Sequence, residues 1–249
     1  MNVLEIRNAT KRFGSLVALR NVALSVPAGE LRAIIGPNGA GKTTLFNLVS
    51  GFFAPSAGSV LFAGRDVTAL AAHQRVALGM ARTFQITEIF PELTVFENVR
   101  IAAEVAAGYR LRPRLGRSER AEVCRRVEQT LELAGLAAKA KRLAGELAHG
   151  DQRVAEIAMA LALKPRLLLL DEPTAGMGEQ ETQEITRLIR RLRAAGELTI
   201  VLIEHDMRVV FHLADRITVL CYGELLAEGT PQEIAANEAV QEAYLGKAA

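Results

Sequence analysis

The sequence predicts an α/β fold built on a parallel β-sheet. Three short and almost wholly apolar segments, 31–35 (LRAII), 167–170 (LLLL) and 199–203 (TIVLI), have the composition of strands buried on both faces. Segments with helical spacing of apolar residues lie between them. Strands that alternate with helices along a chain pair in parallel through right-handed crossovers, which gives this fold class.

The length and composition fit one large domain, or a domain that carries a subdomain. The chain has 249 residues, of which 50% are hydrophobic, so a sizeable core is available and global disorder is not expected. The net charge of +2 does not by itself indicate a nucleic-acid partner.

The sequence favours a reduced, cytoplasmic compartment. The first residues lack the basic and apolar stretches of a secretory signal. The longest uncharged run, 43–64, contains polar and proline residues that do not fit a membrane span. Cys124 and Cys221 lie far apart and lack the spacing of a metal site, and a buried disulfide is the alternative reading.

The two ends of the chain predict most of the strands. Residues 21–52 predict a strand, a turn at 27–29, a second strand, a glycine-rich loop and a helix. The segment 216–229 predicts a hairpin that turns at 222–223. A capping box at 230–233, with proline in its first helical position, predicts that a helix follows.

The central segment, roughly 93–163, has a helical period and predicts an α-helical subdomain inserted into the sheet framework. One helical face is formed by Val123, Val127, Leu131 and Ala134. Gly135 is the expected stop of this helix. Cys124 lies beside the apolar face, which predicts a core position and argues against a reactive role.

A phosphate-binding loop is predicted directly after the strand at 31–35. The segment GPNGAGKT matches the pattern G-x-x-x-x-G-K-[ST] through Gly36, Pro37, Asn38, Gly39, Ala40, Gly41, Lys42 and Thr43. Glycines allow the backbone N–H groups to approach phosphates, and the following helix N-terminus adds positive potential. Lys42 is predicted to reach the β- and γ-phosphates, the Thr43 hydroxyl to bind Mg²⁺, and Thr44 to bond the α-phosphate. The alternative is a glycine turn that carries a lysine by coincidence.

Polar residues follow two of the buried strands. Asp171 ends the run of leucines, where an aspartate can hold the Mg²⁺ of a bound nucleotide. Glu172 beside it is placed to orient an attacking water or accept its proton. His205 follows the strand at 199–203 and is a candidate γ-phosphate sensor. The alternatives are solvated acids and an ordinary strand-end histidine.

These motifs stand in an order that resembles the ATPase domain of ABC transporters. The phosphate loop is followed by TFQ, LAHGDQR, LLLLDEP and IEHDM, and the resemblance covers nearly the whole chain. It implies a P-loop NTPase (RecA-like) fold with a parallel-sheet core, an antiparallel β part and the inserted helical subdomain. It also implies a single ATPase domain over 1–249 that hydrolyses ATP with Mg²⁺.

The resemblance implies a role for each motif. Phe13 would stack on adenine, and Gln85 would contact Mg²⁺ or its water near the membrane partner. Asp171 would be the Walker B aspartate, Glu172 the catalytic base and His205 the switch histidine. In the family, two such subunits sandwich two ATP molecules, with the signature of one facing the phosphate loop of the other.

The signature departs from the usual L-S-G-G-Q. It is formed here by Leu147, Ala148, His149, Gly150 and Asp151. Ala148 lacks the serine hydroxyl, Asp151 adds a negative charge, and Gly178 stands where the family usually has an aspartate. A turn at Gly150 followed by a helix is expected. The departures resemble the ATPases of branched-chain amino-acid importers, whose signature is similar to L-A-Y-G-D-Q-R, so a working site is expected.

The resemblance also implies partners and location. It indicates an importer for branched-chain or related hydrophobic amino acids, with systems for urea, amides or lipid export and a soluble ATP-driven clamp as alternatives. Expected partners are a second ATPase subunit (a heterodimer, with a homodimer as the alternative), membrane permeases and, indirectly, a periplasmic or extracellular substrate-binding protein, but no nucleic acid. The expected location is peripheral, at the cytoplasmic face of the cell membrane.

A basic segment interrupts the central region. It contains Arg110, Arg112, Arg114 and Arg117. A solvated loop is the favoured interpretation, and contact with anionic lipid headgroups is the alternative.

Overall fold

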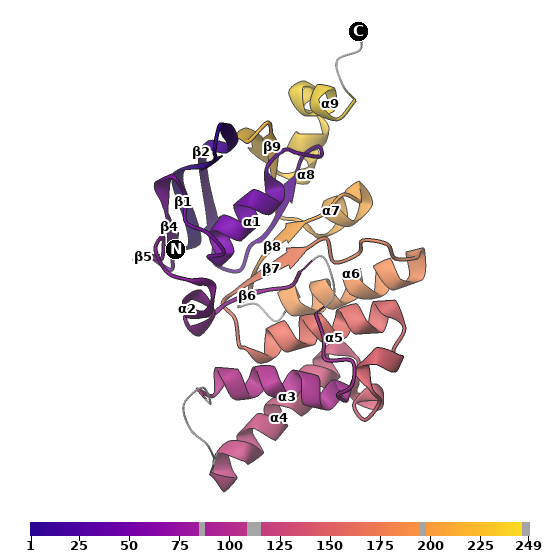
Figure 1. Cartoon of the computed structure of the whole chain (residues 1–249). Helices are drawn as coiled ribbons and strands as arrows, with labels where there is room; N and C mark the ends of the chain where they lie inside the picture. The colour runs from indigo at the N-terminus through magenta and orange to yellow at the C-terminus, as the bar shows by residue number, and fades with distance from the viewer. Residues whose placement is uncertain (85–87, 109–115, 195–197, 246–249) are drawn as a thin grey trace.

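The computed structural model describes residues 1–84, 88–108, 116–194 and 198–245 (Figure 1). It confirms the predicted α/β fold. One sheet has six strands in the order β10-β9-β3-β8-β7-β6. Its strands are β3 (Leu31–Ile35), β6 (Met80–Arg82), β7 (Leu167–Asp171), β8 (Thr199–Ile203), β9 (Arg216–Cys221) and β10 (Glu224–Gly229). All neighbours in it are parallel except β9 and β10, which form an antiparallel pair.

A second sheet supplies the antiparallel part that the family resemblance implies. Its four strands have the order β2-β1-β4-β5 and pair antiparallel. They are β1 (Asn2–Phe13), β2 (Leu16–Pro27), β4 (Ala57–Phe62) and β5 (Arg65–Asp66). The sequence locates only β2 among them, because the others alternate polar and apolar residues without a distinctive run.

Helix α1 (Lys42–Ser50) packs between the two sheets (Figure 1). Its apolar side chains share one buried cluster with both sheets, and the cluster includes Leu45, Phe46, Leu48 and Val49 of α1, Leu4 and Val22 of the antiparallel sheet, and Ile34 and Leu169 of the parallel sheet. The helix that begins at the phosphate loop is therefore held on two sides.

The other face of the parallel sheet is covered by four helices in the lower half of Figure 1. They are α3 (Val95–Ala106), α4 (Arg117–Ala134), α5 (His149–Ala162) and α6 (Glu179–Ala194). The short 3₁₀ turns η2 (Ala137–Lys139) and η3 (Ala144–Glu146) join α4 to α5. The predicted face of α4 is buried, and Gly135 ends the helix with a left-handed φ of 78°. Cys124, predicted in the core, is only half-buried because it lies at the margin of that face.

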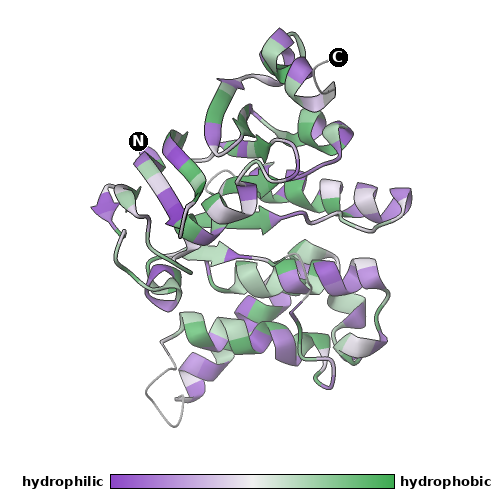
Figure 2. Cartoon of the chain, turned by 45° about the horizontal axis from the view of Figure 1, so that its top comes forward, coloured by the Kyte–Doolittle hydropathy of each residue, from purple (hydrophilic) through white to green (hydrophobic). Residues whose placement is uncertain are grey.

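The remaining helices are short. They are α2 (Ala72–Ala77), α7 (Met207–Leu213), α8 (Pro231–Ala235) and α9 (Glu238–Leu245). Thr230 caps α8 and Glu233 completes the predicted capping box. The hairpin turns at Tyr222 and Gly223, both with positive φ, as the sequence predicts. Figure 2 shows the strands of the parallel sheet as the most continuously apolar part of the chain, which fits burial on both faces.

Both cysteines are free thiols, so the disulfide alternative is excluded. Within the described ranges, no helix has the length and hydrophobicity needed to cross a bilayer.

Candidate functional site

The predicted phosphate loop, 36–43, connects the end of β3 to the start of α1. Gly36 has a φ of 152°, and a Cβ there would lie 2.1 Å from the carbonyl oxygen of Leu220. Only glycine fits this approach to β9. The N–H of Gly223 donates to the carbonyl oxygen of Ala40 over 3.0 Å, so the β9–β10 turn braces the loop.

Buried and exposed residues are interspersed along the loop and into the first turn of α1. The buried members are Gly36, Ala40 and Lys42, the half-buried ones Pro37, Gly41 and Thr44, and the exposed ones Asn38, Gly39 and Thr43. The exposed positions present backbone N–H groups and the Thr43 hydroxyl to solvent, where a phosphate chain can approach.

The ammonium of Lys42 is folded back onto the loop. Its Nζ donates to the carbonyl oxygens of Gly36 (2.7 Å) and Pro37 (3.1 Å). Burial lowers the pKa of Lys42 below its usual value, and the nearby charges of Glu172 and Asp171 act in the opposite direction. The fold therefore brings the phosphate-loop lysine and the acidic pair into one electrostatic neighbourhood.

Asp171 lies at the carboxyl end of β7 and is 3% exposed. Its Oδ2 accepts a hydrogen bond of 2.8 Å from Nη2 of Arg82, the last residue of β6. The sequence interpretation did not single out Arg82, because the two residues are 89 positions apart. A strand-end arginine carries no local signal of such a pairing.

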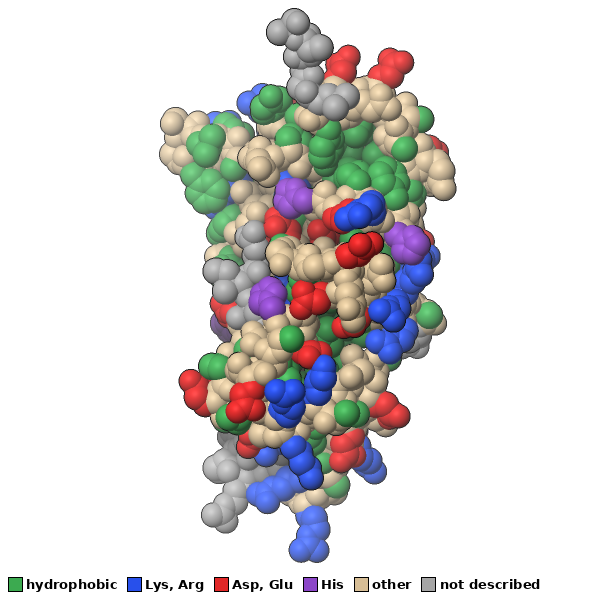
Figure 3. Space-filling model, turned by 90° about the vertical axis from the view of Figure 1, so that its right-hand side faces the viewer, with side chains coloured by type: hydrophobic (Ala, Val, Ile, Leu, Met, Phe, Trp, Pro, Cys, Tyr) green, Lys and Arg blue, Asp and Glu red, His purple; other side chains and the backbone are tan. Residues whose placement is uncertain are grey.

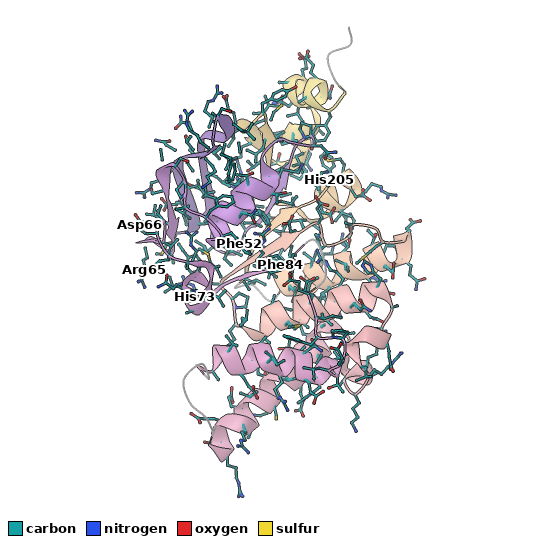
Figure 4. The ribbon with its side chains drawn as sticks, viewed as in Figure 1. Phe52, Arg65, Asp66, His73, Phe84 and His205 are labelled. Atoms are coloured by element: carbon teal, nitrogen blue, oxygen red, sulfur yellow. The ribbon has the colours of Figure 1, made fainter. Side chains whose placement is uncertain are left out.

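Glu172 and His205 meet at the ends of β7 and β8. The Nε2 of His205 lies 2.8 Å from Oε1 of Glu172. The two atoms are within hydrogen-bond distance, so the two side chains fix each other's orientation. Glu172 has a φ of 46°, which is uncommon for a residue with a side chain and is characteristic of functional positions. Figure 4 shows His205 beside α7, at the end of the parallel sheet.

A buried acid, Glu204, aligns this pair and was not predicted. Its Oε1 accepts from the N–H (3.0 Å) and hydroxyl (2.6 Å) of Thr174, and its Oε2 accepts from the N–H of His205 (3.0 Å). Glu204 thereby ties the loop after Glu172 to the loop that carries His205. These three residues also line a cavity of about 240 Å³ together with Glu172.

Arg153 of α5 joins the acidic pair to the helices and was also missed by the sequence interpretation. It is 2% exposed, and its Nη2 donates to the carbonyl oxygens of Asp171 (2.6 Å) and Glu172 (3.2 Å). Its Nη1 donates to Glu156 over 2.6 Å and also to the carbonyl oxygen of Phe84. Burial raises the pKa of Glu156, and the charge of Arg153 acts in the opposite direction.

The predicted signature lies at the start of α5. Ala148 is the N-cap of this helix, and its side chain makes no capping hydrogen bond. The helix begins at His149. The helix expected after a turn around Gly150 is present, but it begins one residue before Gly150, which therefore lies in its first turn. The Gly150 N–H donates to Glu181 over 3.1 Å, and the same carboxylate accepts from Gly178 over 3.2 Å. Glu181 therefore links Gly150, which matches the usual signature, to Gly178, where the family usually has an aspartate.

The negative charge of Asp151 is balanced within the chain. Lys139 of η2 donates to it over 2.5 Å, with side chains that are 39% and 21% exposed. This pairing was not predicted. It leaves the first turn of α5 less negative than the sequence alone indicates. Ala148 and His149 are exposed, while Leu147 is buried. In Figure 3, acidic and basic side chains are interspersed over the visible face.

Phe13, predicted to contact adenine, is half-exposed at the end of β1. Its ring packs edge to face on Phe53 with centroids 5.4 Å apart. The Lys11 ammonium lies 5.1 Å from the Phe13 centroid and 4.4 Å from that of Phe53. Gln85 and the arginines at 110, 112 and 114 lie outside the described residues, whereas Arg117 begins α4.

Comparison with known families decides what this arrangement belongs to. A model of the ABC transporter family matches residues 19–175. The chain belongs to the ABC transporter family. A second model, described as branched-chain amino acid ATP-binding cassette transporter, matches residues 224–249 of the cassette. The family consists of ATP-hydrolysing subunits, so the cassette is an ATPase that binds adenine nucleotide.

Relatives of the cassette match it along its whole length. It is 42% identical to the high-affinity branched-chain amino acid transport ATP-binding protein LivG of Salmonella typhimurium, over 99% of this chain and 98% of the relative. Identity is 41%, with the same coverage, to the corresponding protein BraF of Pseudomonas aeruginosa. The solved ADP conformation of MJ1267, an ATP-binding cassette of an ABC transporter, superposes with a TM-score of 0.87 at 31% identity, over 99% of this chain and 100% of that one.

The residues of the cassette fit a nucleotide-bound Mg²⁺. Thr43 offers a hydroxyl and Asp171 a carboxylate, both hard oxygen ligands that Mg²⁺ prefers. The described residues contain no group of three or more His, Cys, Asp or Glu that could hold a metal. A site with few protein ligands suits Mg²⁺ that arrives with phosphates, since the phosphates and waters complete its coordination.

Proposed function

We propose that this chain is the ATP-hydrolysing subunit of an ABC importer for branched-chain or related hydrophobic amino acids. The observation that carries the proposal is the 41–42% identity over 99% of the chain to ATP-binding proteins of branched-chain amino-acid transport. The match of residues 224–249 to a model of the same transporter class adds independent support.

ATP binds at the phosphate loop in this proposal. Lys42 releases the carbonyl oxygens of Gly36 and Pro37 and turns its ammonium to the β- and γ-phosphates. Thr43 and Asp171 would hold Mg²⁺, and the metal would supply positive charge to the phosphates. The loop N–H groups and the N-terminus of α1 bind the phosphates without any change of fold. Thr44 bonds the α-phosphate.

Hydrolysis uses the acidic end of β7. Glu172 accepts a proton from a water whose oxygen attacks the γ-phosphorus, and the bond to the ADP oxygen breaks. The Nε2 of His205 lies 2.8 Å from Oε1 of Glu172, and this contact keeps the carboxylate oriented. When ATP is bound, His205 is the residue that contacts the γ-phosphate and registers its loss. By the family resemblance, Gln85 would contact Mg²⁺ or its water.

Two ATPase subunits form the working unit. The signature of one, 147–151, faces the phosphate loop of the other, and Phe13 contacts the adenine of its own nucleotide. The second subunit is a different ATPase chain in the favoured version, with a homodimer as the alternative. The pair works peripherally at the cytoplasmic face of the membrane, on permease subunits that receive substrate from a binding protein.

The experiment is a pull-down of tagged Glu172→Gln chain from native membranes with ATP, followed by mass spectrometry. Because loss of the base traps bound ATP, we expect permease subunits and a second ATPase. The matched control is the double variant Lys42→Ala/Glu172→Gln, which cannot grip phosphate and should lose the ATP-dependent partners. Recovery of only ribosomal or DNA-associated proteins would contradict the importer proposal.

A second experiment distinguishes the candidate substrates. It measures uptake of isotope-labelled leucine, urea and acetamide in a deletion strain that is complemented with the wild-type chain. Restoration of leucine uptake alone supports the proposal. Restoration of urea or amide uptake without leucine would assign the cassette to the related systems instead.

A further inference from the structure

Arg82 is a largely buried cation to which none of the sequence predictions gives a role. It ends β6, and its side chain is 8% exposed. Its guanidinium donates to side chains of two other elements, α1 and β7. This position lies between the helix that follows the phosphate loop and the strand that carries Asp171.

The hydrogen bonds of Arg82 are divided between its two terminal nitrogens. Nη2 donates to Oδ2 of Asp171 over 2.8 Å. Nη1 donates to Oδ1 of Asn47 (2.6 Å) and to the hydroxyl of Ser50 (2.9 Å), both on α1. An arginine free of other partners usually grips both oxygens of a carboxylate. Here α1 occupies Nη1, so Arg82 holds one oxygen of Asp171.

The consequence for Asp171 is a fixed orientation with one oxygen left over. Within the described part of the chain, no hydrogen bond to its Oδ1 is found, while Oδ2 accepts from Arg82. The backbone of Asp171 is held as well, since its carbonyl oxygen accepts from Arg153 over 2.6 Å. The carboxylate therefore has little freedom to rotate.

Aromatic rings enclose the guanidinium. The centroids of Phe46, Phe52 and Phe84 lie 5.7, 5.6 and 5.2 Å from its central carbon. Phe52 and Phe84 pack edge to face with centroids 5.8 Å apart, and Figure 4 shows these two side chains close together. Rings around a cation exclude water and attract its charge, which strengthens its pairing with the carboxylate.

We propose that Arg82 is the positioning residue of the Mg²⁺–nucleotide site. It holds Oδ2 of Asp171, keeps Oδ1 for the metal or its water, and ties this carboxylate to the helix that carries Thr43. The inference rests on the proposed Mg²⁺–ATP site. A lysine has one compact ammonium and cannot bond α1 and Asp171 in the same fixed plane, so the role requires arginine.

The test measures how strongly Mg²⁺ tightens nucleotide binding. The Kd of the fluorescent nucleotide mant-ADP is determined with Mg²⁺ and with EDTA, for wild type and Arg82→Gln. Loss of a residue that orients a metal ligand lowers metal affinity about tenfold to hundredfold. We expect the ratio of the two Kd values to shrink by about tenfold or more in Arg82→Gln, with the Kd in EDTA changed far less.

Matched variants separate positioning from stability. Arg75 is still more deeply buried, at 1% exposed, and donates to the carbonyl oxygens of Leu48 and Val49 on α1, without a hydrogen bond to Asp171. Arg75→Gln should lower the melting temperature but keep the wild-type ratio of the mant-ADP Kd values measured with EDTA and with Mg²⁺. Arg82→Lys, which keeps the charge and folds more readily, should still lose most of the ratio. Adding Arg82→Gln to Asp171→Asn should cause no further loss.

An unchanged ratio in both Arg82→Gln and Arg82→Lys would overturn the positioning role, even if both variants were less stable. A larger ratio would overturn it too, since Arg82 would then compete with Mg²⁺. If the wild-type chain showed no Mg²⁺ effect on mant-ADP binding, the proposed Mg²⁺–ATP site itself would fail, independently of Arg82.

Discussion

The phosphate-loop region (36–43 with Asp171 and Glu172) and the signature region (147–151) are stabilised in opposite ways. In the phosphate-loop region, charged groups are buried and find partners inside the chain, as Lys42 does on loop carbonyls and Asp171 on Arg82. In the signature region, Ala148 and His149 are exposed, and Asp151 is held by a surface lysine.

This difference indicates where each region gets its geometry. Buried ion pairs are costly to break, because the remaining charge stays in a poorly solvated site. Exposed pairs contribute little and are screened by salt. The phosphate-loop region is therefore organised within one chain, whereas the signature region presents a surface that a second ATPase subunit would complete. The largest effects are expected in the buried region.

Glu172→Gln should cause the largest loss. An amide cannot accept the proton of the attacking water, so kcat should fall by about 10²- to 10⁴-fold. ATP binding should persist, because Lys42 and Thr43 are untouched. Steady-state phosphate release and equilibrium mant-ATP binding measure the two properties. Turnover at the native rate would refute the assignment of Glu172 as the base.

Arg153→Met should strongly destabilise the fold. It leaves the Glu156 carboxylate buried without its cation, so the free energy of unfolding should fall by about 3–5 kcal/mol. Urea denaturation measures this loss. The double variant Arg153→Met/Glu156→Leu removes both charges and should recover much of the loss. A single variant within about 0.5 kcal/mol of wild type would mean that the pair is as weak as a surface pair.

The pH dependence of that loss sharpens the comparison. Burial raises the pKa of Glu156 above its ordinary value of 4.5, so the folded chain keeps a proton that the unfolded chain releases. The contribution of this bound proton to the free energy of unfolding is fully present below pH 4.5. It is lost as the pH rises through the raised pKa of Glu156. Removing Arg153 raises that pKa further. The destabilisation of Arg153→Met should therefore grow as pH rises above 4.5, and a constant difference would contradict it.

Ala148→Ser probes the exposed region. A hydroxyl that bonds a phosphate is worth about 1.5–3 kcal/mol, so ATP-driven association should tighten by roughly tenfold to hundredfold. Sedimentation in the Glu172→Gln background, alone and mixed with the second ATPase subunit, with and without ATP, measures it. Ala138→Ser, at an exposed position outside the signature, is the control. An unchanged association constant would mean that backbone N–H groups alone provide the contact.

Lys139→Ala should have the smallest effect. Its pair with Asp151 is partly exposed, so the unfolding free energy should fall by about 0.2–1 kcal/mol at low salt and by less at 1 M salt. Urea denaturation at both ionic strengths checks this. A loss of several kcal/mol that persists at high salt would show that the signature region is held as firmly as the phosphate-loop region.

Local patterns predicted much of this molecule. The apolar runs of β3, β7 and β8, the hairpin at Tyr222 and the capping box at Thr230 all follow from neighbouring residues. The strands β1, β4 and β5 could not be predicted in this way, because alternating polar and apolar residues do not specify a partner strand. The start of α5 lies slightly earlier than expected, since Gly150 resembles a turn residue but already lies in the first helical turn.

The sequence by itself determined the fold class, the phosphate loop and the family, because these depend on residue types at short, fixed spacing. Only the tertiary structure decided that Arg82 holds Asp171, that Arg153 reaches the carbonyl oxygen of Asp171, and that Glu204 binds Thr174. Such contacts join residues that the chain order separates. They form because the parallel sheet brings the carboxyl ends of distant strands to one edge, where buried charges must find a partner.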